Sequence, residues 1–168
     1  SDLRLWLQGT VDLPKRRQVV DVCDRGADTF EFLEHEVESN CTLVVRSAHS
    51  RSIWIGHDLN ETNGTPTLLH TYARTLPALG NCELAVAQKT LVKKTKRKGK
   101  KTTSIRTQRV ARLSVAAAPV LLKAPASKHG EHGNAPLPLW IVRVWESNPP
   151  VGEEALEWLL LTNHPVTT

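Results

Sequence analysis

The carboxylate of Asp24 is the side chain best placed for chemistry. It directly follows Gln18–Cys23 (QVVDVC), a largely apolar, β-branched run that is typical of a buried strand. In open α/β sheets, ligands bind outside the carboxyl ends of the strands. A carboxylate there can ligate Mg²⁺ or Mn²⁺ and take part in metal-assisted phosphoryl transfer. The alternative is an aspartate that caps the turn after a strand.

Positive charge is concentrated in one segment. Lys89–Arg112 contains eleven Lys or Arg and no Asp or Glu, whereas the rest of the chain has eleven basic and seventeen acidic residues. Basic residues that neutralise phosphates gain free energy by releasing condensed counterions, so this segment favours a nucleic-acid partner. A solvated loop or a localisation-type patch is the alternative. The centre, Lys93–Lys101 (KKTKRKGKK), has no hydrophobic residue and predicts a loop that contacts a nucleic-acid backbone without reading its sequence.

Cysteine and histidine give weaker signals. The three cysteines, Cys23, Cys41 and Cys82, form no CxxC pair, which favours free thiols in a reducing compartment over a zinc knuckle or disulfides. His129 and His132 lie in a Gly- and Pro-rich stretch without further clustered ligands. That setting favours an ordinary surface loop over a metal site.

The elements that position Asp24 are predicted from hydrophobic period and capping residues. After the strand Gln18–Cys23 and a turn, Asp28 begins a helix, because the sequence DTFE has the form of a capping box. Apolar residues repeat at helical spacing along 28–38, and we expect the opposite face to be solvated. That face carries Glu31, Glu34, Glu36 and Glu38. With Thr42–Val45 as a second buried strand, the segment predicts a βαβ unit with parallel strands and a right-handed crossover.

Beyond residue 48 the sequence pattern changes. A short helix is predicted around Leu68–Leu76, and a more buried final strand at Trp158–Thr162. Alternation with a period of two predicts half-exposed antiparallel strands at Cys82–Lys89, Arg109–Val115 and Leu139–Trp145. The expected fold class is α/β plus mostly antiparallel β, divided into a βαβ part over 1–48 and a β-rich part over 49–168 with a basic loop at 89–112.

Composition sets the outer limits. With 168 residues, 40% hydrophobic and 23% charged, the chain can bury a core and is not typical of disorder. No apolar run approaches the roughly 20 residues of a membrane helix, so we expect no membrane partner and a cytoplasmic location. The chain begins Ser1-Asp2 without methionine, and we expect it to be an internal piece of a longer protein.

Four segments, in order, resemble a known family. They are Val20–Asp28 (VDVCDRGAD), Leu43–Ser47 (LVVRS), Arg109–Val115 (RVARLSV) and, most specific, Asn148–Thr162 (NPPVGEEALEWLLLT). They are similar to the strand-DRxAD segment, the next core strand, a basic strand and the NPPxGEEPLEWLLLT block of bacterial insertion-sequence transposases of the DDE class. In this cut-and-paste group a β-stranded insertion domain interrupts a ribonuclease-H-like core. The resemblance assigns 1–48 to part of the core and 49–168 to the insertion.

The resemblance implies an active site of two Asp and one Glu, drawn from three places, that holds Mg²⁺ or Mn²⁺. Asp24 matches the second Asp, as catalytic residue and metal ligand. The first Asp is expected upstream of Ser1 and the Glu beyond Thr168. We therefore expect this chain alone to bind no catalytic metal tightly and to cleave no DNA. Family members commonly have Glu where this chain has Gly26.

Double-stranded DNA at transposon ends is the partner that the resemblance implies, bound by a homodimer of the complete protein. Arg46 matches an arginine close to the active site and can clamp a phosphate. Trp158 matches a tryptophan that stacks on a flipped base in hairpin-forming members, with packing in its own strand as the alternative. The basic residues expected to position DNA by charge are Lys93, Lys94, Lys96, Arg97, Lys98, Lys100, Lys101, Arg109 and Arg112.

Two function classes follow. In the first, the chain belongs to a transposase that cuts and joins DNA at transposon ends by metal-dependent phosphoryl transfer, in the bacterial cytoplasm near the nucleoid. In the second, it is a non-catalytic nucleic-acid-binding β module in which Asp24 is structural and the basic segment makes all contacts. A structural β domain with a disordered basic loop is a third alternative.

Overall fold

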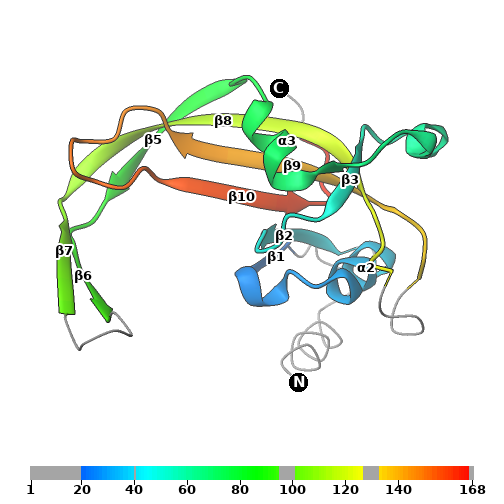
Figure 1. Ribbon diagram of the computed structural model, residues 1–168, viewed down its shortest axis with the longest axis horizontal. Helices are drawn as coiled ribbons and strands as arrows, with labels where there is room; N and C mark the ends of the chain where they lie inside the picture. Colours follow the sequence, from blue (N-terminus) through cyan, green and yellow to red (C-terminus); the bar gives the residue numbers. More distant parts are fainter. Residues whose placement is uncertain (1–19, 40, 95–100, 127–132, 167–168) are drawn as a thin grey trace.

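A mixed β-sheet with two helices is the framework of the computed structural model, which describes residues 20–39, 41–94, 101–126 and 133–166, with the backbone alone for 61, 63, 89–94 and 101–106. The described strands of the main sheet are β1 (Val20–Cys23), β2 (Thr42–Arg46), β3 (Ser52–Ile55), β4 (Thr67–Leu68), β5 (Gly80–Val86), β8 (Arg109–Leu122), β9 (Leu137–Glu146) and β10 (Glu157–Thr162). The helices are α2 (Phe30–Glu38) and α3 (Leu69–Thr75), with 3₁₀ turns η1 (Arg25–Ala27) and η2 (Leu59–Asn63). The order of the sheet is β1-β2-β10-β9-β8-β3-β4, and β5 also pairs with β8 (Figure 1).

The predicted βαβ unit is confirmed. Strands β1 and β2 are parallel, with Cys23 opposite Val45, and α2 connects them. The prediction that β1 is buried on most of its surface is wrong. Within the described part of the chain β1 is an edge strand, and Val22, on its face away from α2, is 76% exposed.

The predicted antiparallel strands are confirmed, and the sheet runs without a break from the βαβ unit into them. Strand β10 pairs antiparallel with β2 on one side and with β9 on the other. Strand β8 is longer than its alternating pattern suggested, because one half pairs with β5 and the other half with β3. The polar stretch after β2 gave no strand signal, yet β3 and β4 form there and pair with each other.

A loop over 89–112 is a prediction that the structure corrects. β6 (Lys89–Lys94) pairs antiparallel with β7 (Lys101–Arg106) as a separate two-stranded sheet, and Arg109–Arg112 begins β8. Threonine and aliphatic residues between the charges of 89–94 and 101–106 favour strands. Residues 95–100, in the centre of the predicted loop, lie outside the described residues. The β6–β7 hairpin projects from the end of the long strands that is farthest from β3. It lies on the same side of β10 as the βαβ unit (Figure 1).

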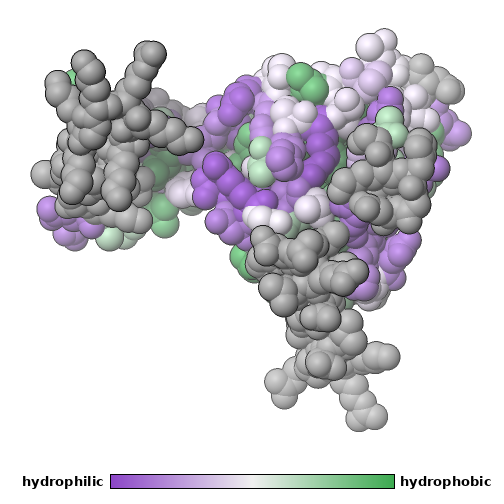
Figure 2. Space-filling model, turned by 60° about the horizontal axis from the view of Figure 1, so that its bottom comes forward, coloured by the Kyte–Doolittle hydropathy of each residue, from purple (hydrophilic) through white to green (hydrophobic). Residues whose placement is uncertain are grey.

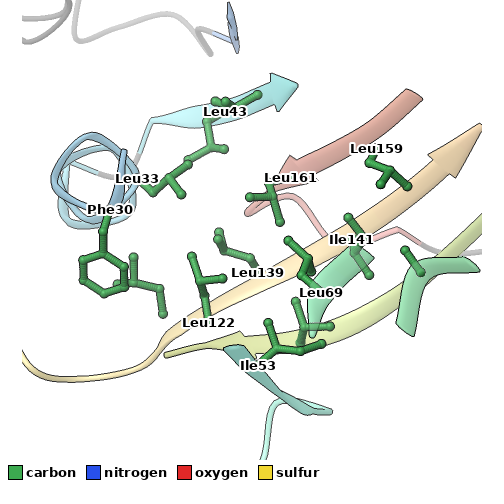
Figure 3. Close-up of a cluster of buried hydrophobic side chains, with 14 of the residues drawn as sticks. Phe30, Leu33, Leu43, Ile53, Leu69, Leu122, Leu139, Ile141, Leu159 and Leu161 are labelled. Carbon is green, nitrogen blue, oxygen red and sulfur yellow. The ribbon is translucent and has the colours of Figure 1, made fainter. Parts of the chain in front are cut away.

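Both helices pack on one face of the sheet and share one hydrophobic core. Phe30 and Leu33 of α2 point toward Leu43 and Leu139 of the sheet, and Leu69 of α3 meets the same cluster from the other end (Figure 3). Each of these side chains is buried. The predicted periodic face of α2 is therefore its core face.

The start of α2 differs from the capping box. Thr29, not Asp28, is the N-cap, and its Oγ1 accepts a hydrogen bond of 3.3 Å from the Phe32 backbone N–H. Asp28 is instead buried among residues of the β2–β3 connection. Among the described residues, no helix has the length and apolar character needed to cross a membrane.

One predicted solvent-facing glutamate of α2 is buried. Glu36 is 0% exposed and lies beside Asp21 of β1. The pKa of Glu36 is raised from 4.5 to about 7, mainly by burial and to a smaller extent by the neighbouring Asp21 carboxylate. The carboxyl group therefore takes up a proton on folding at mildly acidic pH.

This proton uptake predicts a pH dependence of stability. Because the folded-state pKa of Glu36 lies above its unfolded value, the contribution of Glu36 to stability is largest below pH 4.5 and is lost as the pH rises through about 7. We expect Glu36→Gln to remove this fall, measured by urea unfolding at a series of pH values with a metal chelator present. Glu38→Gln, an exposed change on the same helix, is the control and should keep it. Parallel pH curves for the wild type and Glu36→Gln would contradict the assignment.

Candidate functional site at the carboxyl ends of β1 and β2

Asp24 and Arg46 lie together at one edge of the sheet. Because β1 and β2 are parallel and in register, the residues that end them are neighbours. Asp24 Oδ1 is 3.8 Å from Arg46 Nη1, and the Asp24 side chain is 78% exposed. A pair this open to water contributes little to stability. Both side chains are therefore free to exchange partners with a bound ligand.

The buried carboxylate of Asp28 holds the turn that follows Asp24 in place. Its Oδ2 accepts hydrogen bonds from the backbone N–H groups of Ala48 (2.5 Å) and His49 (3.0 Å), and its Oδ1 accepts one from Arg51. Arg51 also donates to the Asp28 carbonyl. These contacts join η1 to the segment that follows β2, so the two strand ends cannot separate without unpairing a buried charge.

A polar pocket of about 240 Å³ opens beside this pair. Its floor includes Ser47, whose Oγ lies 2.8 Å from His70 Nε2 of α3. The pKa of His70 is lowered mainly by burial and further by the positive charge of Arg74. The imidazole is therefore neutral at physiological pH. The lining residues are Arg25, Arg46, Ser47, Ala48, His70, Arg74, Glu157 and Leu159.

Glu157 organises the far wall of the pocket. Its Oε2 is 2.7 Å from Arg74 Nη2 and its Oε1 is 3.0 Å from Arg143 Nη2. The hydrogen bond from Arg74 is the main cause of the lowered pKa of Glu157. The Glu157 carboxylate is thus shared by two guanidinium groups, while in the described part of the chain Asp24 pairs with Arg46, and Arg25 also lines the pocket. Arginine therefore outnumbers carboxylate, which suits an anion with several oxygen atoms.

Asp24 alone does not make a site for Mg²⁺ or Mn²⁺. Within the part of the chain that the structure describes, it belongs to no cluster of three potential metal ligands. Hard divalent cations need several oxygen ligands, and the neighbouring Arg46 guanidinium opposes a cation. These residues can hold phosphate oxygens, and they could contribute one ligand to a metal site completed by other carboxylates.

Trp158 lies on β10, close to this edge. It is half-buried against a small apolar cluster that includes Val86 and Leu156. Its remaining surface borders a pocket of about 270 Å³ that Leu84 and Gln88 also line. Arg46 is opposite Leu160 in the register, two residues beyond Trp158, so both side chains belong to the same face of the sheet. Trp158 therefore packs on one side and borders this second pocket on the other, and its stacking on a base stays a prediction.

The predicted DNA-contacting residue Arg109 is paired with two carboxylates. Its guanidinium is 10% exposed, pairs with Glu146 at 2.8 Å and also contacts Glu153. The Arg109 hydrogen bond lowers the pKa of Glu146, so the pair stays ionised. The alternating sequence pattern gave no sign of this pairing, because both acids are more than 30 residues away.

The other predicted basic contacts divide into three groups. Arg112 is 88% exposed and only loosely paired with Glu83 at 3.5 Å, so it is open to a ligand. Lys93, Lys94 and Lys101 lie on the strands of the β6–β7 hairpin. Lys96, Arg97, Lys98 and Lys100 lie outside the described residues. So do His129 and His132.

Sequence reasoning missed Arg25, His70 and Arg74. His70 and Arg74 are on a correctly predicted short helix, but nothing local indicates that this helix meets the carboxyl ends of β1 and β2. Hydrophilic residues gather across the middle of the face that Figure 2 presents.

A search against protein-family models finds none that matches this chain.

The backbone geometry of η1 predicts the effect of a substitution at Gly26. The transposase family that the sequence resembles commonly has Glu at this position. A Cβ added at Gly26 meets nothing within 4 Å, and its backbone is not in the left-handed region. We therefore expect Gly26→Ala to stabilise the protein by about 0.4–1 kcal/mol, because it restricts the unfolded chain. Thermal and urea unfolding measure this.

Gly152 provides the matched comparison. Its φ is +85°, so Gly152→Ala should destabilise by about 1 kcal/mol or more, although a Cβ there also meets open space. If Gly26→Ala costs as much as Gly152→Ala, then the turn after Asp24 needs glycine and the description of η1 is wrong.

Proposed function

We propose that this chain is the part of a DDE-class transposase that supplies one catalytic carboxylate, Asp24, and a DNA-contacting surface, with 1–48 belonging to a ribonuclease-H-like core. The observation that carries the proposal is the position of Asp24, exposed at the carboxyl end of β1 and 3.8 Å from Arg46 at the end of the parallel β2. Asp28, by contrast, is buried and accepts several hydrogen bonds, so its role is structural.

The surroundings of Asp24 suit phosphodiester chemistry. Arg25, Arg46 and Arg74 line one pocket, and guanidinium groups bind phosphate oxygens in two-pronged geometry. Such cations can position a DNA backbone beside a carboxylate and stabilise the negative charge that develops during strand cleavage. In this proposal Arg46 leaves Asp24 for a phosphate when DNA binds.

The surroundings of β1 support the idea that other carboxylates join Asp24. Among the residues that the structure describes, β1 is an edge strand, and Val20 and Val22 expose apolar surface on the face away from α2. A further strand or helix packed there would cover this surface and could bring acidic side chains to the end of β1. Mg²⁺ or Mn²⁺ would then be held by Asp24 together with those carboxylates.

The hairpin and the site share one side of the molecule. In Figure 1, β6 and β7 hang on the same side of β10 as β1 and β2, at the opposite end of the long strands. A duplex that lies along this side could meet Lys93 and Lys101 at one end and Arg46 at the other. Charge at the hairpin would position the DNA without reading its sequence.

A non-catalytic nucleic-acid-binding module is the second candidate. One observation favours it: among the described residues, Asp24 has a cation for its neighbour and no cluster of metal ligands around it. In that case the Asp24–Arg46 pair orients the arginine for a phosphate, and the carboxylate takes no part in chemistry.

Substitution of Asp24 separates the two candidates. In the complete polypeptide, Asp24→Asn should lower Mn²⁺-dependent cleavage of duplexes that carry the ends flanking its gene by at least about 100-fold, since electrostatic stabilisation of the transition state is lost. Binding of the same duplexes should change little. Asp58→Asn, an exposed carboxylate after β3, is the control and should keep full activity. Cleavage that survives Asp24→Asn would leave only the binding module.

Neutralisation of the hairpin tests DNA contact in this chain. We expect a duplex-binding affinity that falls steeply with salt. Each phosphate contact removed should make the slope of log K against log[salt] shallower by about 0.9. The residues to change to Gln are Lys93, Lys94, Lys96, Arg97, Lys98, Lys100 and Lys101.

The control for this experiment is Lys123→Gln. Lys123 lies beyond the opposite end of β8, over the ring of Trp54 at 5.6 Å, and should not alter the salt slope. An unchanged slope after neutralisation of the hairpin would show that the basic segment makes no contact with DNA.

A further inference from the structure

Three potential metal ligands converge below α2, away from Asp24. They are the carboxylate of Asp21 on β1, the carboxylate of Glu36 on α2 and the thiol of Cys41, which directly precedes β2. Their ligand atoms all lie within 4.8 Å of one another. Each comes from a different element, so the group exists only in the folded protein.

The carboxylates in this group lack a donor or cation among the described residues. Glu36 is fully buried and neither of its oxygens receives a hydrogen bond from a donor group; its neighbour is the Asp21 carboxylate, to which it can hydrogen-bond only through a shared proton. Asp21 Oδ2 is buried and unpartnered as well. Two buried carboxylates that face each other without a compensating group cost free energy, because each is desolvated and they repel. The fold must supply either a proton or a cation.

A cation accounts for more of the geometry than a proton does. A shared proton would satisfy the two carboxylates only and would leave the Cys41 thiol without a role. A metal ion would be bound by all three groups at once. Cys41 is half-buried rather than enclosed, so an ion can reach the site from solvent.

We propose that Asp21, Glu36 and Cys41 bind one divalent metal ion of the zinc class, which fastens α2 to β1 and to the start of β2. Two carboxylates and a thiolate are ligands that Zn²⁺ accepts, with water in the fourth position. On binding, Cys41 and Glu36 release their protons to solvent, because only the ionised groups ligate. Mg²⁺ does not suit the site, since a hard cation avoids thiolate.

This site is separate from the candidate functional site. Asp21 is paired with Leu43 in the β1–β2 register and lies under α2, whereas Asp24 follows the end of β1 and points into solvent. The spacing 21, 36 and 41 matches no zinc motif. The convergence arises because Glu36 lies on the core side of α2, which helical period alone assigned to solvent.

Cobalt titration of the purified, metal-free chain tests the proposal. Co²⁺ should bind in one equivalent and give thiolate-to-cobalt absorption in the near ultraviolet together with the visible bands of a tetrahedral site. Cys41→Ser should abolish the thiolate absorption and weaken binding by at least about tenfold. Cys82→Ser, which removes an exposed thiol on β5, is the matched control and should leave the spectrum unchanged.

Glu36→Gln keeps the test decisive if Cys41→Ser fails to fold. It conserves shape and removes a buried charge, so the metal-free variant should fold at least as well as the wild type, while Zn²⁺ should raise the melting temperature of the wild type only. Asp24→Asn should retain the full cobalt spectrum, which separates this site from the proposed function. Absence of thiolate absorption in the wild type, or absorption that survives Cys41→Ser, would overturn the proposal in favour of a carboxyl pair that shares a proton.

Discussion

The buried carboxylate of Asp28 is the contact on which the arrangement of the site depends. It accepts hydrogen bonds from Ala48, His49 and Arg51, residues that follow β2, while its own backbone ends η1. The two strand ends that carry Asp24 and Arg46 are thereby held together by a charge that has no access to water. Such a carboxylate, once deprived of its partners, costs several kcal/mol, which makes the juxtaposition a stable property of the fold.

The parts of the fold that depend on local pattern were predictable from the sequence. The βαβ unit, the short helix and the alternating strands follow from the period of apolar residues, and the place of Asp24 at the carboxyl end of β1 follows from the apolar run before it. Pairings between distant residues were not predictable. Arg109 bonds with Glu146 and Glu153, and Glu36 faces Asp21, because chain segments far apart in sequence meet. The β6–β7 hairpin was not predicted, because the density of positive charge in 89–112 was taken to indicate a loop and the β-branched residues between the charges were given less weight.

The chain combines two chemically different surfaces on one sheet. One face is sealed by α2 and α3 over a single hydrophobic core (Figure 3). At the carboxyl ends of β1 and β2, Asp24 lies near arginines that outnumber the neighbouring carboxylates. The basic β6–β7 hairpin projects from the opposite end of the long strands of the sheet. This distribution of charge suits a polyanionic partner, and under the proposed function the exposed carboxylate would lie beside a bound phosphodiester.

We propose above all that Asp24 is a metal-ligating carboxylate that faces DNA. The most direct measurement is a structure of the complete polypeptide bound to a transposon-end duplex with Mn²⁺. The account predicts Mn²⁺ coordinated by Asp24 together with carboxylates from other parts of the polypeptide, and a phosphate of the cleaved strand bound by Arg46. A duplex that passes elsewhere, with Asp24 still paired to Arg46 and no metal beside it, would contradict the account.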